Sequence, residues 1–174
     1  MNGLVPAGKP QIYAIALGSN QPRSRTHTPY ALVKEAMAAF SCPPFRLIAQ
    51  SPIIETPPIG PSLRRYANGA ALIETPLPPK TLLALLKHME KMAGRRRGRR
   101  WGARPLDLDI ILWSGGHQST GSAPIIPHPR YRERSFVLAP LMALIPDWRD
   151  PITGRTVRQE YFRLKKPAKI PKAG

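Results

Sequence analysis

Residues 99–112 read RRWGARPLDLDIIL, and the second half of this segment alternates between apolar and acidic side chains. A period of two that ends in a branched apolar run predicts a β-strand with one buried face. Asp107 and Asp109 then share a face, about 6.5–7 Å apart along the backbone. Two carboxylates at this separation suit hard cations, which take oxygen ligands. The segment therefore predicts a strand and a candidate metal site together.

The segment before this strand is strongly basic. Residues 94–104 contain six arginines and no acidic residue. Guanidinium groups bind phosphate oxygens in pairs, while metal ions neutralise and orient phosphates. This combination favours polyphosphate chemistry. The other interpretation is that Asp107 and Asp109 lie on a solvated strand face beside an unrelated basic loop.

The composition indicates one globular domain with a large excess of positive charge. The chain has 174 residues, 42% hydrophobic content and a net charge of +17. This charge points to polyanions, and the charge alone leaves nucleotide phosphates, nucleic acid and no particular partner as open alternatives. The single cysteine, Cys42, excludes an internal disulfide and favours a reducing compartment. Because we find neither a long apolar run nor a secretory signal, we expect a cytoplasmic protein that does not enter membranes.

Local patterns predict strands and helices in the order of an α+β fold. Strands are expected at residues 12–17, 45–54, 66–74 and 106–113, and helices at residues 29–40, 79–93 and 135–145. One helix between the first two strands and another between the last two give the ferredoxin-like βαββαβ order. We expect a single domain at residues 12–162, with a mostly antiparallel sheet and helices packed on it. Residues 1–11 are expected to form a flexible arm, and residues 163–174 a disordered basic tail.

The helix at residues 79–93 has the clearest amphipathic pattern. Leu82, Leu86 and Met89 fall on one apolar ridge. Lys87 and Glu90 are expected on the opposite, polar face.

Two further motifs suit the recognition of a flat heterocycle. Residues 55–61 (ETPPIGP) contain three prolines, which fix backbone dihedrals and hold backbone groups in set positions. Tyr66 and Asn68 are two apart on a predicted strand, so an aromatic ring and an amide share a face. From these residues alone, a plain connector followed by a strand-start tyrosine and a turn asparagine is an open alternative.

Together these motifs resemble the 6-hydroxymethyl-7,8-dihydropterin pyrophosphokinase family of folate biosynthesis, over about residues 12–144. The similarity rests on Gly18-Ser19-Asn20, the proline-rich residues 56–61, Tyr66-x-Asn68, the arginines and Trp101 that lead into Asp107-x-Asp109, and Pro127-His128 followed by Arg134 and Phe136. The resemblance implies an enzyme that transfers pyrophosphate from its co-substrate ATP to the pterin alcohol and leaves AMP. It also implies two Mg²⁺ ions.

The resemblance assigns roles to individual residues. Asp107 and Asp109 would hold the two Mg²⁺ ions. The catalytic set would be Arg95, Arg104, Asp107 and Asp109. The ATP side would comprise Glu90, Arg97, Trp101, His128 and Arg134, with Trp101 also stacking on the pterin. The pterin side would comprise Thr56, Pro57, Ile59, Tyr66, Asn68 and Phe136.

The chain departs from the family pattern in three places. Ala103 replaces a proline, residues 21–24 replace a glycine-rich turn, and Lys87 stands where some members have a glutamine near the nucleotide. We therefore assign no nucleotide contact to Lys87.

The alternative function is a basic RNA- or DNA-binding module that uses the arginine-rich segment and the tail. It leaves the paired aspartates without a role. We therefore expect ATP and the pterin as partners, no nucleic acid, no membrane and a monomer.

Overall fold

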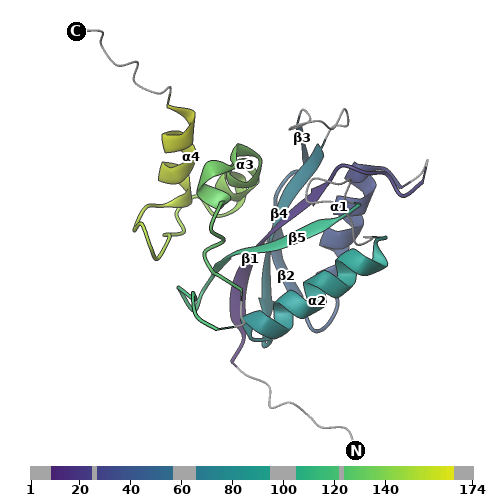
Figure 1. The fold of residues 1–174 in the computed structure, drawn as a ribbon, viewed down its shortest axis with the longest axis horizontal. Helices are drawn as coiled ribbons and strands as arrows, with labels where there is room; N and C mark the ends of the chain where they lie inside the picture. Colours follow the sequence, from purple (N-terminus) through teal and green to yellow (C-terminus); the bar gives the residue numbers. More distant parts are fainter. Residues whose placement is uncertain (1–8, 25–26, 57–65, 95–104, 122–123, 167–174) are drawn as a thin grey trace, which may run out of the picture.

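The computed structural model describes residues 9–24, 27–56, 66–94, 105–121 and 124–166 (Figure 1). Its elements are β1 (Gln11–Ser19), α1 (Pro29–Ala39), β2 (Arg46–Gln50), β3 (Ile54–Thr56), β4 (Tyr66–Thr75), α2 (Pro79–Met92), β5 (Asp107–Trp113), the short 3₁₀ helix η1 (Tyr131–Glu133), α3 (Ser135–Leu144) and α4 (Val157–Lys165). Helices lie on both sides of one sheet (Figure 1).

The sheet is antiparallel and has the strand order β2-β4-β1-β5, with β3 also paired to β4. This is the expected ferredoxin-like order, so the predicted α+β fold is confirmed. The strand expected at residues 45–54 is divided into β2 and β3. Pro52 in the gap cannot donate to a ladder. Ser51 bridges the break, because its hydroxyl accepts a hydrogen bond from the Ala70 N–H at 2.9 Å.

Helices α1 and α2 cover one face of the sheet. Thr28 begins α1, and its side chain accepts a hydrogen bond from the Ala31 N–H at 3.2 Å. Met37 of α1 packs directly on the backbone of β4 at Gly69. A Cβ atom at Gly69 would lie 2.3 Å from Met37 Cε, so a larger residue there would require the flexible end of the Met37 side chain to move.

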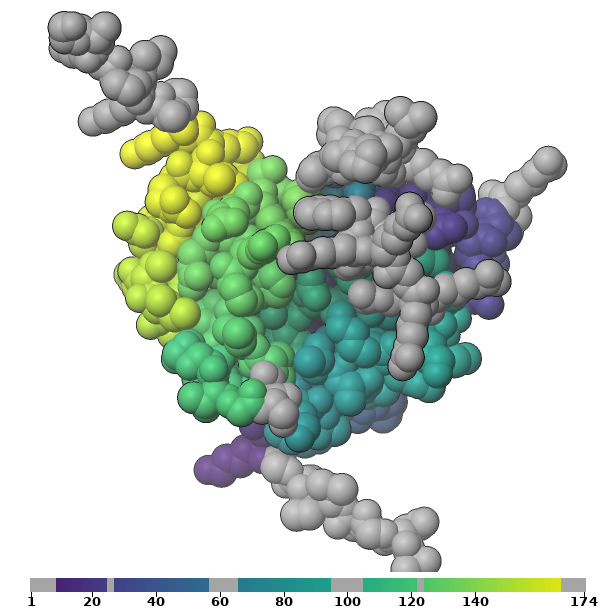
Figure 2. Space-filling view, in the orientation of Figure 1, coloured from purple at the N-terminus to yellow at the C-terminus, as the bar shows by residue number. Residues whose placement is uncertain are grey.

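Helix α3 packs on the opposite face, and α4 packs against α3 (Figure 1). The buried residues of this second core are Ala14, Ala70, Ile111, Leu112, Tyr131, Val137, Leu138, Leu141, Ile145 and Val157. Figure 2 shows the green and yellow residues of α3 and α4 on one side of the molecule and the teal residues of α2 on the other. Of the helices that the structure describes, none is long and apolar enough to cross a bilayer.

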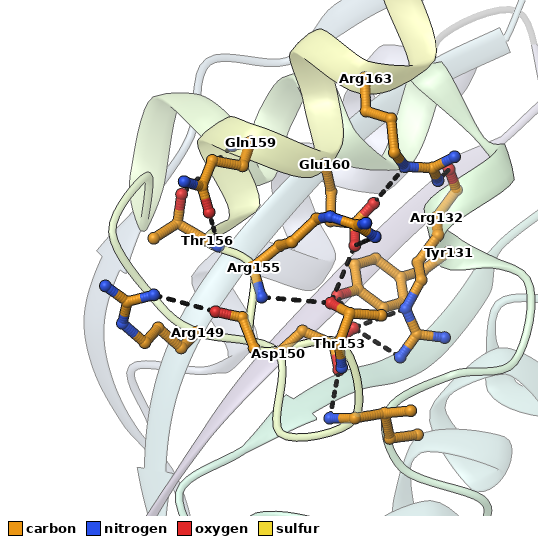
Figure 3. A network of polar contacts seen from close by, with 12 residues as sticks. Tyr131, Arg132, Arg149, Asp150, Thr153, Arg155, Thr156, Gln159, Glu160 and Arg163 are labelled. Atoms are coloured by element: carbon orange, nitrogen blue, oxygen red, sulfur yellow. Dashed lines mark hydrogen bonds and ion pairs between the residues drawn. The ribbon is translucent and has the colours of Figure 1, made fainter.

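A buried carboxylate, Asp150, holds the turn between α3 and α4 (Figure 3). Its Oδ2 atom accepts hydrogen bonds from Tyr131 Oη at 2.5 Å and Arg132 Nε at 2.6 Å. Its Oδ1 atom accepts from the backbone N–H groups of Ile152 at 2.7 Å and Thr153 at 3.2 Å. Burial acts to raise the pKa of Asp150, but these hydrogen bonds outweigh it and lower the pKa below its ordinary value of 3.8.

A second buried carboxylate, Glu160, fixes α4 to the same turn. It accepts hydrogen bonds from Thr153 Oγ1 at 2.9 Å and Arg163 Nε at 2.7 Å. Here too burial raises the pKa, and the hydrogen bonds from Arg163 and Thr153 bring it below its ordinary value of 4.5. Residues 163–165 belong to α4, so the prediction that the tail begins at residue 163 is wrong. Arg163 is held in α4 by its hydrogen bond to the buried carboxylate of Glu160, three residues before it.

Candidate functional site

Asp107 and Asp109 share the face of β5 that looks toward α3. Leu108 and Ile110 between and after them are buried on the α2 side, whereas both aspartates are partly exposed. The predicted alternation of β5 is thus confirmed. On β1, Asp109 lies opposite Ala16 and Asp107 lies opposite Gly18. Small residues of β1 therefore adjoin both carboxylates.

A single row across the sheet joins the two halves of the candidate site. Gly18 on β1 pairs with Asp107 on one side and with Asn68 of β4 on the other. Directly paired residues point to the same face, and two strand spacings separate Asn68 and Asp107 by about 10 Å of backbone. A Cβ atom at Gly18 would lie 3.4 Å from Asn68 Oδ1. The glycine therefore leaves space between the amide and the carboxylate.

Thr56, Tyr66 and Asn68 come together at one end of β3 and β4. Asn68 Nδ2 donates a hydrogen bond to Thr56 Oγ1 at 2.9 Å, and Tyr66 lies opposite Thr56 in the strand register. Asn68 is only 4% exposed, so this bond fixes the orientation of its amide. The structure thus brings together three residues that the sequence assigned to one side of the site.

Arg134 and Phe136 lie at the start of α3. The guanidinium carbon of Arg134 is 5.9 Å from the centre of the Phe136 ring, in cation–π contact. Phe136 packs against the core between the sheet and α3. Both residues therefore belong to the helix that covers the face bearing Asn68 and Asp107.

His128 is anchored to β5 and faces Asp109. Its N–H donates to the Ile111 carbonyl at 3.0 Å, and its Nδ1 atom accepts from the Arg130 N–H at 3.2 Å. The ring proton therefore lies on Nε2, which is 3.9 Å from Asp109 Oδ2. Burial lowers the pKa of His128 from its ordinary value, and Arg134 adds to this effect while Asp109 opposes it. A neutral imidazole thus presents an N–H donor beside the carboxylate.

Glu90 and Lys87 of α2 bind the outer edge of β5. Glu90 Oε1 accepts a hydrogen bond from the Leu108 N–H at 2.8 Å, and Lys87 Nζ donates to the Leu108 carbonyl at 3.1 Å. The expectation that Glu90 lies on an exposed polar face is wrong, since it is fully buried. Glu90 follows Leu82 and Leu86 at four-residue intervals, so helical periodicity places it on the buried side of α2. There it meets the backbone of β5, whose polar groups need partners.

Lys87 is a site residue that the sequence reasoning missed. Its Nζ atom lies 2.6 Å from Glu90 Oε1 and 3.6 Å from Asp109 Oδ1. The sequence signal was the i, i+3 spacing of Lys87 and Glu90, which lets the two side chains meet on one helix.

The donor set at β5 fits a hard divalent cation. Asp107 and Asp109 place carboxylates on one face of β5, and both residues are partly exposed. Within the described residues, no group of three or more His, Cys, Asp or Glu side chains is arranged to hold a metal. A Mg²⁺ ion takes few protein ligands and completes its shell with waters and phosphate oxygens. Two carboxylates are therefore a suitable protein contribution.

Several predicted site residues lie outside the described part of the chain. They are Pro57, Ile59, Arg95, Arg97, Trp101 and Arg104.

Comparison with known proteins gives a consistent result. The family model of 7,8-dihydro-6-hydroxymethylpterin-pyrophosphokinase matches residues 14–146. A 2-amino-4-hydroxy-6-hydroxymethyldihydropteridine pyrophosphokinase of Pseudomonas aeruginosa is 41% identical over 140 residues, which cover 79% of this chain and 82% of that protein. The enzyme of the same name from Bacillus subtilis is 36% identical over 154 residues, covering 87% of this chain and 89% of that one.

The fold is also similar to that of a solved structure. The structure of Plasmodium falciparum HPPK-DHPS with pteroate superposes with a TM-score of 0.70 over 92% of this chain, at 14% identity. The match covers 43% of the Plasmodium chain, so this chain spans less than half of that protein. These relatives give no support to the nucleic-acid-binding alternative. With a family model that covers most of its length and relatives at 36–41% identity, this chain belongs to the 7,8-dihydro-6-hydroxymethylpterin-pyrophosphokinase family.

Proposed function

We propose that the chain transfers pyrophosphate from ATP to 6-hydroxymethyl-7,8-dihydropterin. The hydroxymethyl oxygen of the pterin attacks the β-phosphorus of ATP, the bond from that phosphorus to the α–β bridging oxygen breaks, and AMP leaves. The proton of the attacking hydroxyl is released to solvent water. The observation that supports this proposal is the row Asn68–Gly18–Asp107, in which the amide residue and the carboxylate residue lie about 10 Å apart on one face of the sheet.

On the pterin side, Asn68 and Tyr66 are the main recognition groups. Thr56 fixes the Asn68 amide by accepting a hydrogen bond from its Nδ2 atom. The second N–H of that amide and its Oδ1 atom can then bind the edge of the ring. Tyr66 and Phe136 supply aromatic faces for the flat ring, and Pro57 and Ile59 complete this side. Holding the ring here orients its hydroxymethyl group toward β5.

On the phosphate side, Asp107 and Asp109 hold Mg²⁺, and we place two ions there. Bound Mg²⁺ neutralises phosphate oxygens and holds the reacting groups in line. Asp109 is the carboxylate nearest the attacking hydroxyl. His128 donates a hydrogen bond from its Nε2–H group to a phosphate oxygen. Arg134 binds the phosphates beside it through a charge-assisted hydrogen bond.

The arginine-rich segment completes the nucleotide side. Arg95, Arg97 and Arg104 bind phosphate oxygens and stabilise the charge that develops on the leaving AMP, and Trp101 covers the bound substrates. Glu90 acts from behind β5, as a positioning residue for Leu108 and Lys87. We further propose that the protein works as a monomer in the cytoplasm, where ATP is abundant.

The direct test is to incubate the purified protein with ATP, Mg²⁺ and the reduced pterin alcohol, and to measure AMP and the pterin pyrophosphate. We expect one AMP for each pterin pyrophosphate, and no AMP when the pterin is omitted. Inorganic phosphate and ADP as the products, or turnover that does not require the pterin, would overturn the proposal. Asn68→Ala should raise the KM for the pterin more than that for ATP.

A further inference from the structure

Lys87 places a fixed positive charge beside the candidate metal ligands. Its ammonium is held by Glu90 Oε1 at 2.6 Å and by the Leu108 carbonyl at 3.1 Å. These two hydrogen bonds fix Nζ at 3.6 Å from Asp109 Oδ1. The Lys87 side chain is 39% exposed, whereas that of Glu90 is 1% exposed. The Lys87 ammonium is therefore held by the buried Glu90 carboxylate, and it remains partly exposed beside Asp109.

A cation at this position opposes a second cation on the same carboxylate. Charges within 4 Å of each other interact strongly even when they are partly solvated. Glu90 offsets part of the Lys87 charge, but its carboxylate lies behind the ammonium and also binds the Leu108 N–H. Free metal must therefore bind Asp109 against the field of Lys87.

The same ammonium favours a metal that arrives with its own negative charge. A polyphosphate bound to Mg²⁺ brings oxygens that carry excess negative charge, and Lys87 lies within reach of any phosphate bound at Asp109. The sign of the Lys87 effect therefore reverses between the bare cation and the metal–nucleotide complex.

We propose that Lys87 is a positioning residue that makes the aspartate pair selective for the metal–nucleotide complex over the free metal ion. This inference rests on the proposed function, because it takes Asp107 and Asp109 as metal ligands. It adds that this chain, with lysine at residue 87, loads its metal together with the nucleotide rather than before it.

The test measures binding rather than turnover. Mn²⁺ replaces Mg²⁺, and electron paramagnetic resonance counts free Mn²⁺ with wild type, Lys87→Gln and the control Lys91→Gln, which changes an exposed lysine four residues further along α2. We expect Lys87→Gln to lower the Kd for Mn²⁺ alone at least threefold. With a non-hydrolysable ATP analogue and Mn²⁺ together, we expect its Kd to rise at least threefold. Lys91→Gln should leave both constants within twofold of wild type.

Two further variants locate the effect. Lys87→Gln combined with Asp109→Asn should lose the gain in Mn²⁺ affinity, and Lys87→Arg should retain the weak binding of wild type. Removing Lys87 takes away one hydrogen-bond partner of the buried Glu90 carboxylate and lowers the stability of the fold. The comparison is therefore repeated between Glu90→Gln and Glu90→Gln combined with Lys87→Gln, where the same two shifts are expected.

The outcomes separate the two proposals. If Lys87→Gln weakens or leaves unchanged the binding of Mn²⁺ alone, while wild type still makes AMP, the inference about Lys87 is wrong and the proposed function stands. If wild type binds no Mn²⁺ with the nucleotide and makes no AMP, the metal assignment and the inference fail together. Opposite shifts of the two constants support the inference.

Discussion

Tyr131 donates a hydrogen bond from its phenol oxygen to Asp150 Oδ2 at 2.5 Å, although the two residues are 19 apart in the sequence and both are buried. This contact joins η1 to the turn that precedes α4. The loop from β5 to η1 carries His128, and α3, which follows η1, carries Phe136. The Asp150 network therefore supports the part of the chain that covers the candidate site.

Asp150→Ala should lower the free energy of unfolding by about 3–5 kcal/mol, because it leaves Arg132 partly buried without its carboxylate. Asp147→Ala is the matched control three residues earlier. Asp147 is 82% exposed and pairs with Arg158 at 3.4 Å, so its removal should cost less than about 1 kcal/mol. Urea unfolding followed by circular dichroism measures both. Equal losses in the two variants would contradict a structural role of the buried network.

Stability should also fall in acid because of Asp150 and Glu160. Both have a pKa below the ordinary values of 3.8 and 4.5 in the folded protein, so the unfolded chain takes up protons first as the pH falls. Their contribution is complete above about pH 4.5 and is lost progressively as the pH falls from there through the lowered pKa values. Unfolding free energies measured between pH 7 and pH 3 should therefore decline less steeply in Asp150→Asn than in wild type. An identical pH dependence would argue that Asp150 is not charged in the native state.

Asp107→Asn and Asp109→Asn should each reduce kcat roughly 100-fold or more, because a metal supplies several kcal/mol of charge stabilisation in phosphoryl-type transfer. Both side chains are partly exposed, so thermal unfolding should change little. AMP release and circular dichroism melting follow the two properties separately. Turnover near the wild-type rate in either variant would remove these carboxylates from the metal site.

Gly18 should tolerate only a small side chain. A Cβ atom would sit at ordinary contact distance, 3.4 Å from Asn68 Oδ1, so Gly18→Ala should fold and retain most activity. Gly18→Val adds two methyl groups between Asn68 and Asp107, and we expect the KM for the pterin to rise at least tenfold. Steady-state kinetics with each substrate varied in turn measures this. A valine variant with unchanged pterin KM would place the ring elsewhere.

Truncation after Lys166 should leave activity unchanged. The removed segment, residues 167–174, contains two lysines and one large apolar residue, Ile170, so its sequence offers little to bury. Truncation after Thr156 is the contrasting variant, because it removes the buried side chains of Val157 and Glu160 and should prevent folding. A large rise in the KM for ATP in the variant that ends at Lys166 would assign the tail to the nucleotide site.

The sequence predicted the elements well where a pattern is local. The alternation from Leu106 to Ile110 placed both aspartates on one face without knowledge of the sheet, since strand geometry alone determines it. Glu90 was misplaced because the prediction followed its charge and not its four-residue spacing from Leu86. It lies on the buried side of α2, where it meets the edge of β5. The contacts of Lys87 with β5 depend on the same tertiary packing and cannot be read from α2 alone.

The C-terminal part shows the same limit. Thr156 and Gln159 form a capping box, with hydrogen bonds of 2.9 and 3.2 Å, and this local signature marks the start of α4 in the sequence. Burial of Asp150 and Glu160 has no local signature, because it depends on Tyr131, Arg132 and Arg163 arriving from other elements. Pairing of Asn68 with Gly18 and of Gly18 with Asp107 likewise requires the strand order.

The contacts of α2 with Leu108 have a consequence for self-association. Among the described strands β5 ends the sheet, and the outer edge of a sheet is a template on which a second molecule can add a strand. At Leu108 the N–H is bound by Glu90 and the carbonyl by Lys87, so the hydrogen bonds that a foreign strand would use are already made. A lysine–glutamate pair from a neighbouring helix thus blocks strand addition at Leu108, in the first half of β5.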